Sequence, residues 1–333
     1  MRLIKWLRPI LLLAAIWLGL GSWGFLVHKT VHQLAVYKLP ARMAGFFYQN
    51  MDYLVNNAPR PDTRRNQDST EATKHFIDLE MYGADAALRM PAGWDQAVQL
   101  YTRDSLLKYG YVPYHVLFMK EKLVQAFRSG NKDSILFYAT DMGHYIGDAN
   151  VPLHTTVNYD GQLTNQRGLH SLWESTVPEL DMNNWNLYSA RKARYLKHPD
   201  QAIWAAVRQG AALVPALLAA EQEVSKRFSD AQKYRVRTSR GREIKSYSPE
   251  FGKAYAEAVK TEVNAQLLRS AELIADFWYS SWVDAGRPDL NALQPYSKQT
   301  KRQFRQEKQY YKDNLLIPDK LLLSRKTEAR ESE

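Results

Sequence analysis

Two short stretches of the chain place imidazole and carboxylate groups at helical spacing. His144 and Asp148 are four residues apart, and so are His170 and Glu174. Residues four apart on a helix project from one face about a turn apart, so each pair would present two metal-binding groups on the same side. His154 lies between the two pairs and adds a fifth donor. Such a set without sulfur suits zinc or a similar divalent ion.

A single His-x-x-x-Asp pair is more often a surface pair or a core histidine than a metal site. Here three of the chain's eight histidines fall between residues 144 and 174, together with two carboxylates at matching spacing. The sequence contains no cysteine, so disulfides contribute nothing and a metal must be held by His, Asp, Glu, backbone or water. We therefore predict a metal site in this stretch.

Length and composition predict a folded body with an ordinary core. The chain has 333 residues, of which 45% are hydrophobic and 12% aromatic, which excludes a disordered body. The net charge is +10, but residues 1–22 carry +3 and residues 298–333 carry ten basic and six acidic groups. Because the body keeps only +3, total charge is a weak argument for a polyanionic substrate.

The chain begins with a pattern typical of a secretory signal. Residues 1–22 have a basic start, an apolar run from Ile10 to Leu20, and a Gly21-Ser22 end. Such a signal would direct the protein to the periplasm or the extracellular space, and cleavage after Ser22 would make Trp23 the amino terminus. An uncleaved membrane anchor is the alternative.

The remaining pattern predicts an all-α protein with a single multi-helix domain over residues 23–290, followed by a flexible basic extension over residues 291–333. Residues 58–74 and 158–168 are expected to be polar loops. For residues 228–248 we favour a solvated turn over an exposed hairpin or lid. Expected helices span residues 23–37, 94–128 with a break at 110–113, 133–150, 201–227 with a kink at Pro215, and 249–285.

Trp23, Asp62, His75 and the central motif together resemble the zinc-dependent phospholipase C and S1/P1 nuclease superfamily. The likeness runs from Trp23 to about Asp284, and it implies an all-α fold that holds three Zn²⁺ ions in a cleft and hydrolyses phosphate esters. It also implies that Asp148 bridges two ions and that Trp23 binds zinc through a free amino group and its carbonyl oxygen. The implied ligands are Asp62, His75, His144 and Asp148 for one zinc, Trp23, His28 and Asp148 for a second, and His154, His170 and Glu174 for the third.

The resemblance also implies a mechanism. Two bridged ions would lower the pKa of a shared water and supply hydroxide, while the third ion polarises a phosphoryl oxygen, which gives Asp62 and Asp148 catalytic roles. His32, His115 and His198 would then be structural. Asp141 or Asp78 could accept hydrogen bonds from the zinc-bound imidazoles.

Three residues favour the nuclease branch of the superfamily. Arg65 matches an arginine that stabilises transition-state charge, and Phe76 and Asp78 match the positions that receive a base. The neighbouring Arg64 is expected to matter little. We therefore expect a nuclease acting on single-stranded nucleic acid or 3'-nucleotides, with no obligate protein partner.

Other features favour the phospholipase branch. Glu174 stands where nucleases usually have aspartate, the spacing from His154 to His170 is short, and the nuclease disulfides are missing. Phospholipase C acting on phospholipid head groups is therefore the alternative. A non-catalytic, zinc-stabilised binding protein is a third possibility, but structural zinc sites are normally closed by four protein ligands, whereas the third site here has three.

Overall fold

The computed structural model describes residues 24–239 and 242–325. Helices account for 69% of the structure and strands for 3%, so the predicted all-α class is confirmed. The predicted signal peptide and Trp23 lie outside the described residues, as do residues 326–333.

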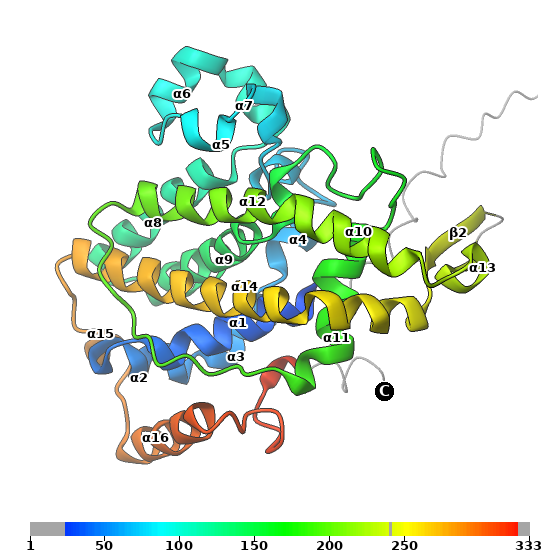
Figure 1. The fold of residues 1–333 in the computed structure, drawn as a ribbon. Coiled ribbons are helices and arrows are strands. Elements are labelled where there is room, and N and C mark those ends of the chain that lie inside the picture. Colours follow the sequence, from blue (N-terminus) through cyan, green and yellow to red (C-terminus); the bar gives the residue numbers. More distant parts are fainter. Residues whose placement is uncertain (1–23, 240–241, 326–333) are drawn as a thin grey trace, which may run out of the picture.

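The body of the protein is built from long helices packed around α1 and α9 (Figure 1). Helix α9 begins after Asn131, whose side chain accepts a hydrogen bond from the Ser134 amide at 2.8 Å, and its apolar side chains are buried. Trp278, near the C-terminal end of α14, is fully buried and donates its indole N–H to the Ala139 carbonyl of α9. The long helices are α1 (Phe25–Lys38), α8 (Val112–Ser129), α9 (Lys132–Ala149), α12 (Pro199–Ser225) and α14 (Pro249–Asp284).

Short elements surround this body, and α5 to α7 form a lobe that projects from it (Figure 1). Residues 58–74, expected to be a loop, contain the short helices α4 and η1, so that expectation was wrong in part. The short helices are α2 (Ala41–Gln49), α3 (Met51–Asn57), α4 (Arg60–Arg64), η1 (Ala72–Lys74), η2 (Leu79–Tyr82), α5 (Ala86–Arg89), α6 (Trp94–Tyr101), α7 (Arg103–Tyr109), η3 (Pro152–Thr155), α10 (Leu169–Ser171), η4 (Leu172–Thr176), α11 (Val177–Asp181), η5 (Met182–Asn184), α13 (Asp230–Lys233) and α15 (Leu290–Leu293).

Helix α12 is the one described helix that is long and apolar enough to cross a membrane by length and composition. Part of this apolar character serves the core, since Ile203, Trp204 and Val207 are buried. Pro215 lies inside α12 without ending it.

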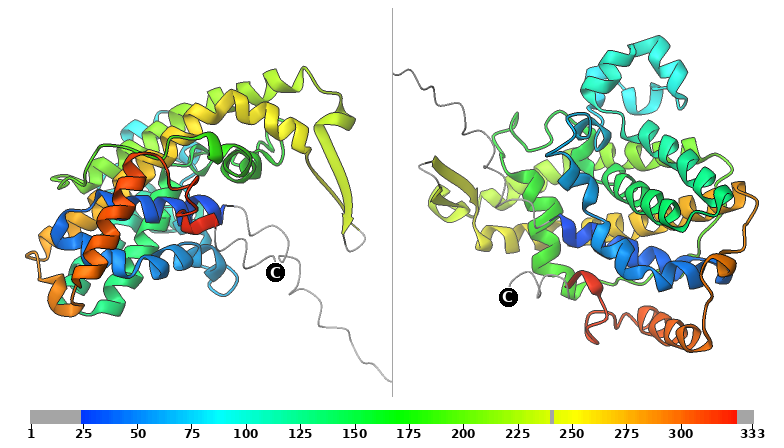
Figure 2. Two further views of the ribbon diagram at one scale, coloured as in Figure 1. Left: turned by 90° about the horizontal axis from the view of Figure 1, so that it is seen from below. Right: turned by 180° about the vertical axis from the view of Figure 1, so that it is seen from behind.

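Residues 234–247 form an antiparallel hairpin, so the solvated turn favoured for this region was wrong. Strand β1 (Tyr234–Ser239) pairs with β2 (Arg242–Tyr247), with Tyr234 opposite Tyr247. The hairpin projects from the ends of α12 and α14 (Figure 2). The Tyr247 ring stacks on Phe251, and its hydroxyl donates to Glu221 at 2.9 Å. The contacts of Tyr247 thus anchor the hairpin to the body, whereas a solvated turn would not be anchored.

The described part of the C-terminal extension is folded, in contrast to the flexible tail predicted. Helix α16 (Lys298–Lys312) buries Phe304 and Tyr311, and Tyr311 stacks on Tyr37 of α1. The following residues return across α1, where the Gln33 side chain donates to the Leu321 carbonyl and accepts from the Leu323 amide. The tail thus holds α1 in place from outside.

We expect deletion of residues 298–333 to destabilise the protein. The deletion removes the buried side chains of Phe304, Tyr311, Leu316 and Leu322, each of which contributes roughly 1.5–3 kcal/mol when buried. Thermal unfolding should therefore occur at a clearly lower temperature. A control that ends after Arg325 should unfold with the full chain, and equal unfolding temperatures for all three proteins would contradict a structural role for the tail.

Candidate metal centre

The structure gathers eight of the nine predicted metal ligands into three groups, and the ninth, Trp23, lies outside the described residues. Within each group the ligand atoms lie within 4.8 Å of one another, so each group could hold a metal ion. The groups are His28, His144 and Asp148; Asp62, His75 and His144; and His154, His170 and Glu174.

Two glycines of α9 allow α1 to approach closely enough for His28 to reach Asp148. A Cβ atom at Gly143 would lie 2.4 Å from the His32 Nε2, and one at Gly147 would lie 3.1 Å from the His28 ring. His32 is fully buried, with its ring nitrogens 2.7 Å from the His28 carbonyl oxygen and 2.9 Å from that of Thr140. His32 thus fixes the spacing between the two helices and has the structural role expected of it.

The two carboxylate oxygens of Asp148 face different partners. Its Oδ1 lies 3.3 Å from the His28 Nε2, whereas its Oδ2 lies 2.9 Å from the His75 Nδ1 and 3.3 Å from the His144 Nε2. Asp148 is only 1% exposed, so both oxygens are available to protein or metal partners rather than to bulk water. The carboxylate therefore joins the first two groups.

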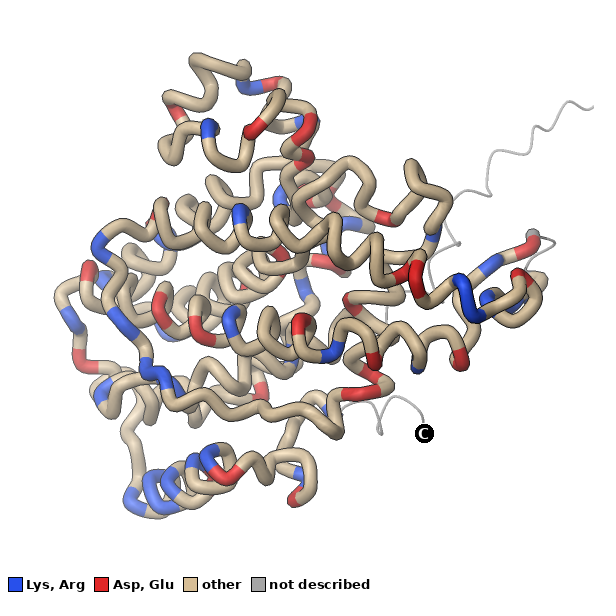
Figure 3. Tube along the Cα trace, viewed as in Figure 1, with Lys and Arg blue, Asp and Glu red and all other residues tan. Residues whose placement is uncertain are grey.

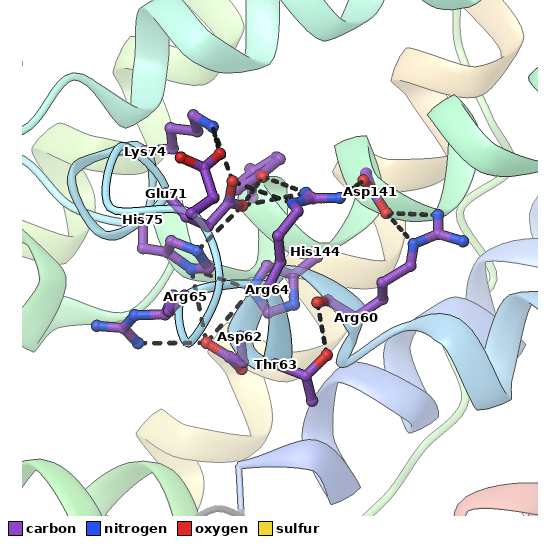
Figure 4. Close-up of polar contacts among 12 residues, drawn as sticks. Arg60, Asp62, Thr63, Arg64, Arg65, Glu71, Lys74, His75, Asp141 and His144 are labelled. Atoms are coloured by element: carbon purple, nitrogen blue, oxygen red, sulfur yellow. Dashed lines mark hydrogen bonds and ion pairs between the residues drawn. The ribbon is translucent and has the colours of Figure 1, made fainter. Parts of the chain in front are cut away.

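Asp62 and Arg65 lie at the accessible edge of these two groups (Figure 4). The Asp62 Oδ1 lies 3.7 Å from the His75 Nδ1 and 3.8 Å from the His144 Nε2. The Asp62 side chain is 26% exposed, and that of Arg65 is 45% exposed. The Arg65 guanidinium lies 3.3 Å from the same Asp62 oxygen.

The third group forms where α9 ends and the chain returns through α10 and η4. The His170 Nε2 lies 2.7 Å from the Glu174 Oε2 and 3.3 Å from the His154 Nε2. The His154 Nε2 lies 3.5 Å from the same Glu174 oxygen. Glu174 also approaches His28, at 3.9 Å, so the third group adjoins the first.

Within the three groups the separations between paired donor atoms run from 2.7 Å, between His170 and Glu174, to 3.8 Å, between Asp62 and His144, and three of them match a tetrahedral ion. Ligand atoms about 2.0–2.1 Å from a tetrahedral ion are about 3.3 Å apart. The His28–Asp148, His144–Asp148 and His154–His170 pairs are each separated by 3.3 Å. Five imidazoles and three carboxylates form a donor set suited to zinc.

Backbone carbonyls orient two of the imidazoles. The His144 Nδ1 lies 2.9 Å from the Ala58 carbonyl oxygen, and the His154 Nδ1 lies 2.7 Å from the His75 carbonyl oxygen. An Nδ1–H donated to each carbonyl leaves the Nε2 lone pair directed into the groups, as metal-binding histidines require.

Buried charges compensate one another in the site. Burial opposes ionisation of Asp148, but His144 and His154 hold its pKa well below the usual range. Burial likewise opposes ionisation of Glu174, whose pKa is held low by His154 and His170. Burial lowers the pKa of His154, but Asp148 and Glu174 outweigh it and raise that pKa to about 9. A proton on His154 thus helps to balance the carboxylates, and a bound cation would displace it.

A polar network that sequence reasoning missed supports His75. Glu71 is fully buried, and its carboxylate lies 3.6 Å from the His75 Nε2. It also accepts hydrogen bonds from Arg64 and from the Tyr145 hydroxyl and pairs with Lys74. The Glu71-x-x-x-His75 spacing was the available signal, because it repeats the four-residue interval of the central motif.

Two expectations around this network need correction. Arg64, expected to matter little, pairs with both Glu71 and Asp141 and so ties α4 to α9. Asp141, expected to support an imidazole, instead binds Arg60 and Arg64. Glu71, rather than Asp141, faces the Nε2 of His75, one of the candidate ligands.

Phe76 and Asp78 flank the site without joining it. Among the described residues neither makes a polar contact with the donor side chains. Phe76 packs against Gly110, where an added Cβ would lie 2.3 Å from the Phe76 carbonyl oxygen, while the amide of Asp78 donates to the Tyr109 carbonyl. Burial and the nearby Glu80 raise the pKa of the Asp78 carboxyl to about 6.

The other two histidines assigned structural roles lie away from the donors. His115 is edge-on to the Tyr145 ring, and burial lowers its pKa to about 3. His198 is exposed and immediately precedes α12.

No known family model matches the chain, and no curated protein matches it. The donor set and its geometry therefore carry the functional argument.

We expect Asp148→Asn to lower the amount of zinc bound per chain. The substitution keeps the side chain's size but replaces one of two charged oxygens that face separate donor groups with an amide. Asp141→Asn is a matched control, because it makes the same change at another buried position of α9 that faces arginines. Elemental analysis should show metal loss only in the Asp148 variant, and unchanged metal content there would contradict its place in the site.

Proposed function

We propose that the protein is a zinc-dependent phosphodiester hydrolase of the nuclease kind, acting on single-stranded nucleic acid or 3'-nucleotides. The observation that carries the proposal is the convergence of three donor groups on Asp148 and Glu174, with distances suited to zinc. Eight described donors include only three carboxylates. With three divalent ions bound, the charge would be −3 plus +6, or +3, which attracts a phosphodiester.

Bound zinc would supply a nucleophile from water near neutral pH and polarise the phosphoryl group. The chain's own residues divide the remaining tasks. Asp148, His28 and His144 are buried and hold the centre together, whereas Asp62 and His170 have side chains 26% and 31% exposed. Substrate could therefore approach along the Asp62 and His170 edge. The third group offers only three protein donors, which leaves a position for water or substrate.

Arg65 is suited to binding a phosphoryl oxygen at this edge. Its guanidinium now pairs with the Asp62 carboxylate at 3.3 Å. Coordination of Asp62 to a cation would neutralise that carboxylate and weaken its hold on Arg65. The guanidinium could then bind phosphate, with which it forms short, charge-assisted hydrogen bonds.

Asp78 supports the nuclease branch. It is half-exposed, and with a pKa near 6 its carboxyl can accept or donate a hydrogen bond close to neutral pH. The polar edge of a nucleobase offers both hydrogen-bond donors and hydrogen-bond acceptors.

A second observation favours phospholipase C. Tyr159 and Leu163 are exposed on the loop that leads to α10, and the Tyr159 ring lies 6.2 Å from that of His170. Exposed apolar groups beside a donor group could contact lipid.

Export with removal of residues 1–22 is part of the proposal. Gly24 lies against the third group, because a Cβ added there would be 3.2 Å from the Glu174 Oε1. In this proposal the amino group freed by cleavage completes a ligand set, whereas an amide nitrogen is a poor ligand. We expect the exported, fully metallated protein to begin at Trp23, as amino-terminal sequencing would show. An active, fully metallated chain that retains Met1 would contradict this.

We expect Arg65→Ala to keep its zinc and lose turnover by about two to three orders of magnitude, the scale for losing one donor to transition-state charge. Arg64→Ala is the control one residue away, and it should lower thermal stability because it removes the link between Glu71 and Asp141. Bound zinc and kcat are measured on a single-stranded oligonucleotide and on a short-chain phosphatidylcholine. A wild-type protein that hydrolyses only the lipid, with Arg65→Ala silent, would favour phospholipase C.

A further inference from the structure

Helix α16 carries its basic residues in one narrow stripe. At about 100° per residue, its six Lys and Arg side chains fall within an arc of about 120° and extend over about 21 Å of helix. Five of them are exposed and Lys308 is half-buried. The basic stripe consists of Lys298, Lys301, Arg302, Arg305, Lys308 and Lys312.

The acidic groups near α16 leave this stripe uncompensated. Glu307, the only acidic residue of the helix, turns inward and accepts hydrogen bonds from the hydroxyls of Tyr37 and Tyr48. Asp313, just after the helix, accepts both of its hydrogen bonds from Gln309. Among the described residues, none of the six cations has a carboxylate within the 4.0 Å of an ion pair. Figure 3 shows the resulting concentration of positive charge along α16.

Like charges crowd this surface. Burial and the neighbouring Lys312 and Lys192 lower the pKa of Lys308. Lys192 is exposed and comes from the segment that precedes α12, so the positive surface extends beyond one helix. Clustered cations repel one another, and an extended polyanion would relieve that repulsion.

The exposed surface of the helix beside the basic stripe is polar. Its other exposed residues are glutamines, such as Gln303 and Gln306, while Phe304 and Tyr311 are buried against the body. Helices that lie on membranes instead expose apolar side chains that enter the lipid. A line of cations bordered by amides fits a flexible strand that carries one phosphate per unit.

We propose that the basic stripe of α16 binds the phosphate backbone of single-stranded nucleic acid, outside the metal centre. The choice of a nucleic-acid strand rests in part on the phosphodiester hydrolase proposed above. Helix α16 packs near Tyr37, at the end of α1 opposite His28, so its stripe would hold the polymer at a distance from the donors.

The test uses the full mature chain and a labelled oligothymidine whose phosphorothioate backbone keeps its charge and resists cleavage. The triple variant Lys301→Gln, Arg302→Gln, Arg305→Gln removes three exposed cations and retains good helix formers. Its matched control, Arg89→Gln, Arg103→Gln, Lys122→Gln, removes equal charge from exposed positions elsewhere. Fluorescence anisotropy should show affinity lowered at least about tenfold in the stripe variant alone. The slope of log affinity against log salt concentration should also be less steep by about 2 in this variant. This corresponds to about 0.7 for each phosphate that no longer meets a cation.

Equal affinity and equal salt dependence for the two triple variants would overturn the inference. So would a stripe variant that binds the oligonucleotide normally but loses binding to phosphatidylglycerol vesicles, which would assign the surface to membranes. Hydrolysis of a small chromogenic phosphodiester, too short to reach α16, tests the metal centre separately. If the wild type fails to hydrolyse it while the stripe still controls oligonucleotide affinity, the proposed hydrolase is wrong and the binding surface stands.

Discussion

The buried carboxylate of Asp148 is the constraint on which the structure depends. An ionised group out of contact with water is costly unless opposite charge and hydrogen-bond donors surround it. The nearest imidazoles come from α1, α9 and the segment after η1. Each of these elements must therefore be held closely in place, because a displaced imidazole would leave an unpaired buried charge.

The rest of the fold can be understood as the means of meeting that requirement. Gly143 and Gly147 let α1 lie close to α9. The C-terminal segment packs on the outer side of α1, where its backbone hydrogen bonds with the Gln33 side chain. On the other side, the pairing of Arg64 with Glu71 and Asp141 fixes α4 on α9. Asp62 lies in α4, so the pairing of Arg64 with Glu71 and Asp141 determines the position of the Asp62 carboxylate.

Local residue spacing predicted the central part of the site. The residues that it could not predict are those whose positions depend on partners far away in the sequence. The pairs His144 with Asp148 and His170 with Glu174 follow from helical periodicity alone, since both members lie on one short segment. Asp62 has no such local signal, and only the resemblance indicated Asp62 and His75 as ligands. Glu71 did have the four-residue interval, but it lies in a stretch whose polarity suggested a loop. Its burial depends on Tyr145 and Arg64, partners that a linear pattern does not bring together.

The C-terminal segment shows the same limit and explains why total charge was a poor guide. Its Lys, Arg and Gln content suggested a flexible tail, because two buried aromatic residues among fifteen give little apolar signal. Packing of Phe304 and Tyr311 nevertheless fixes the orientation of the whole helix, and that orientation aligns its cations on the outer face. The single acidic side chain of the helix, Glu307, points toward the body and accepts hydrogen bonds from two tyrosine hydroxyls. Helical periodicity places the aromatic residues of α16 on its buried face and its cations on the opposite, exposed face. A modest excess of positive charge thus produces a concentrated positive field on one surface.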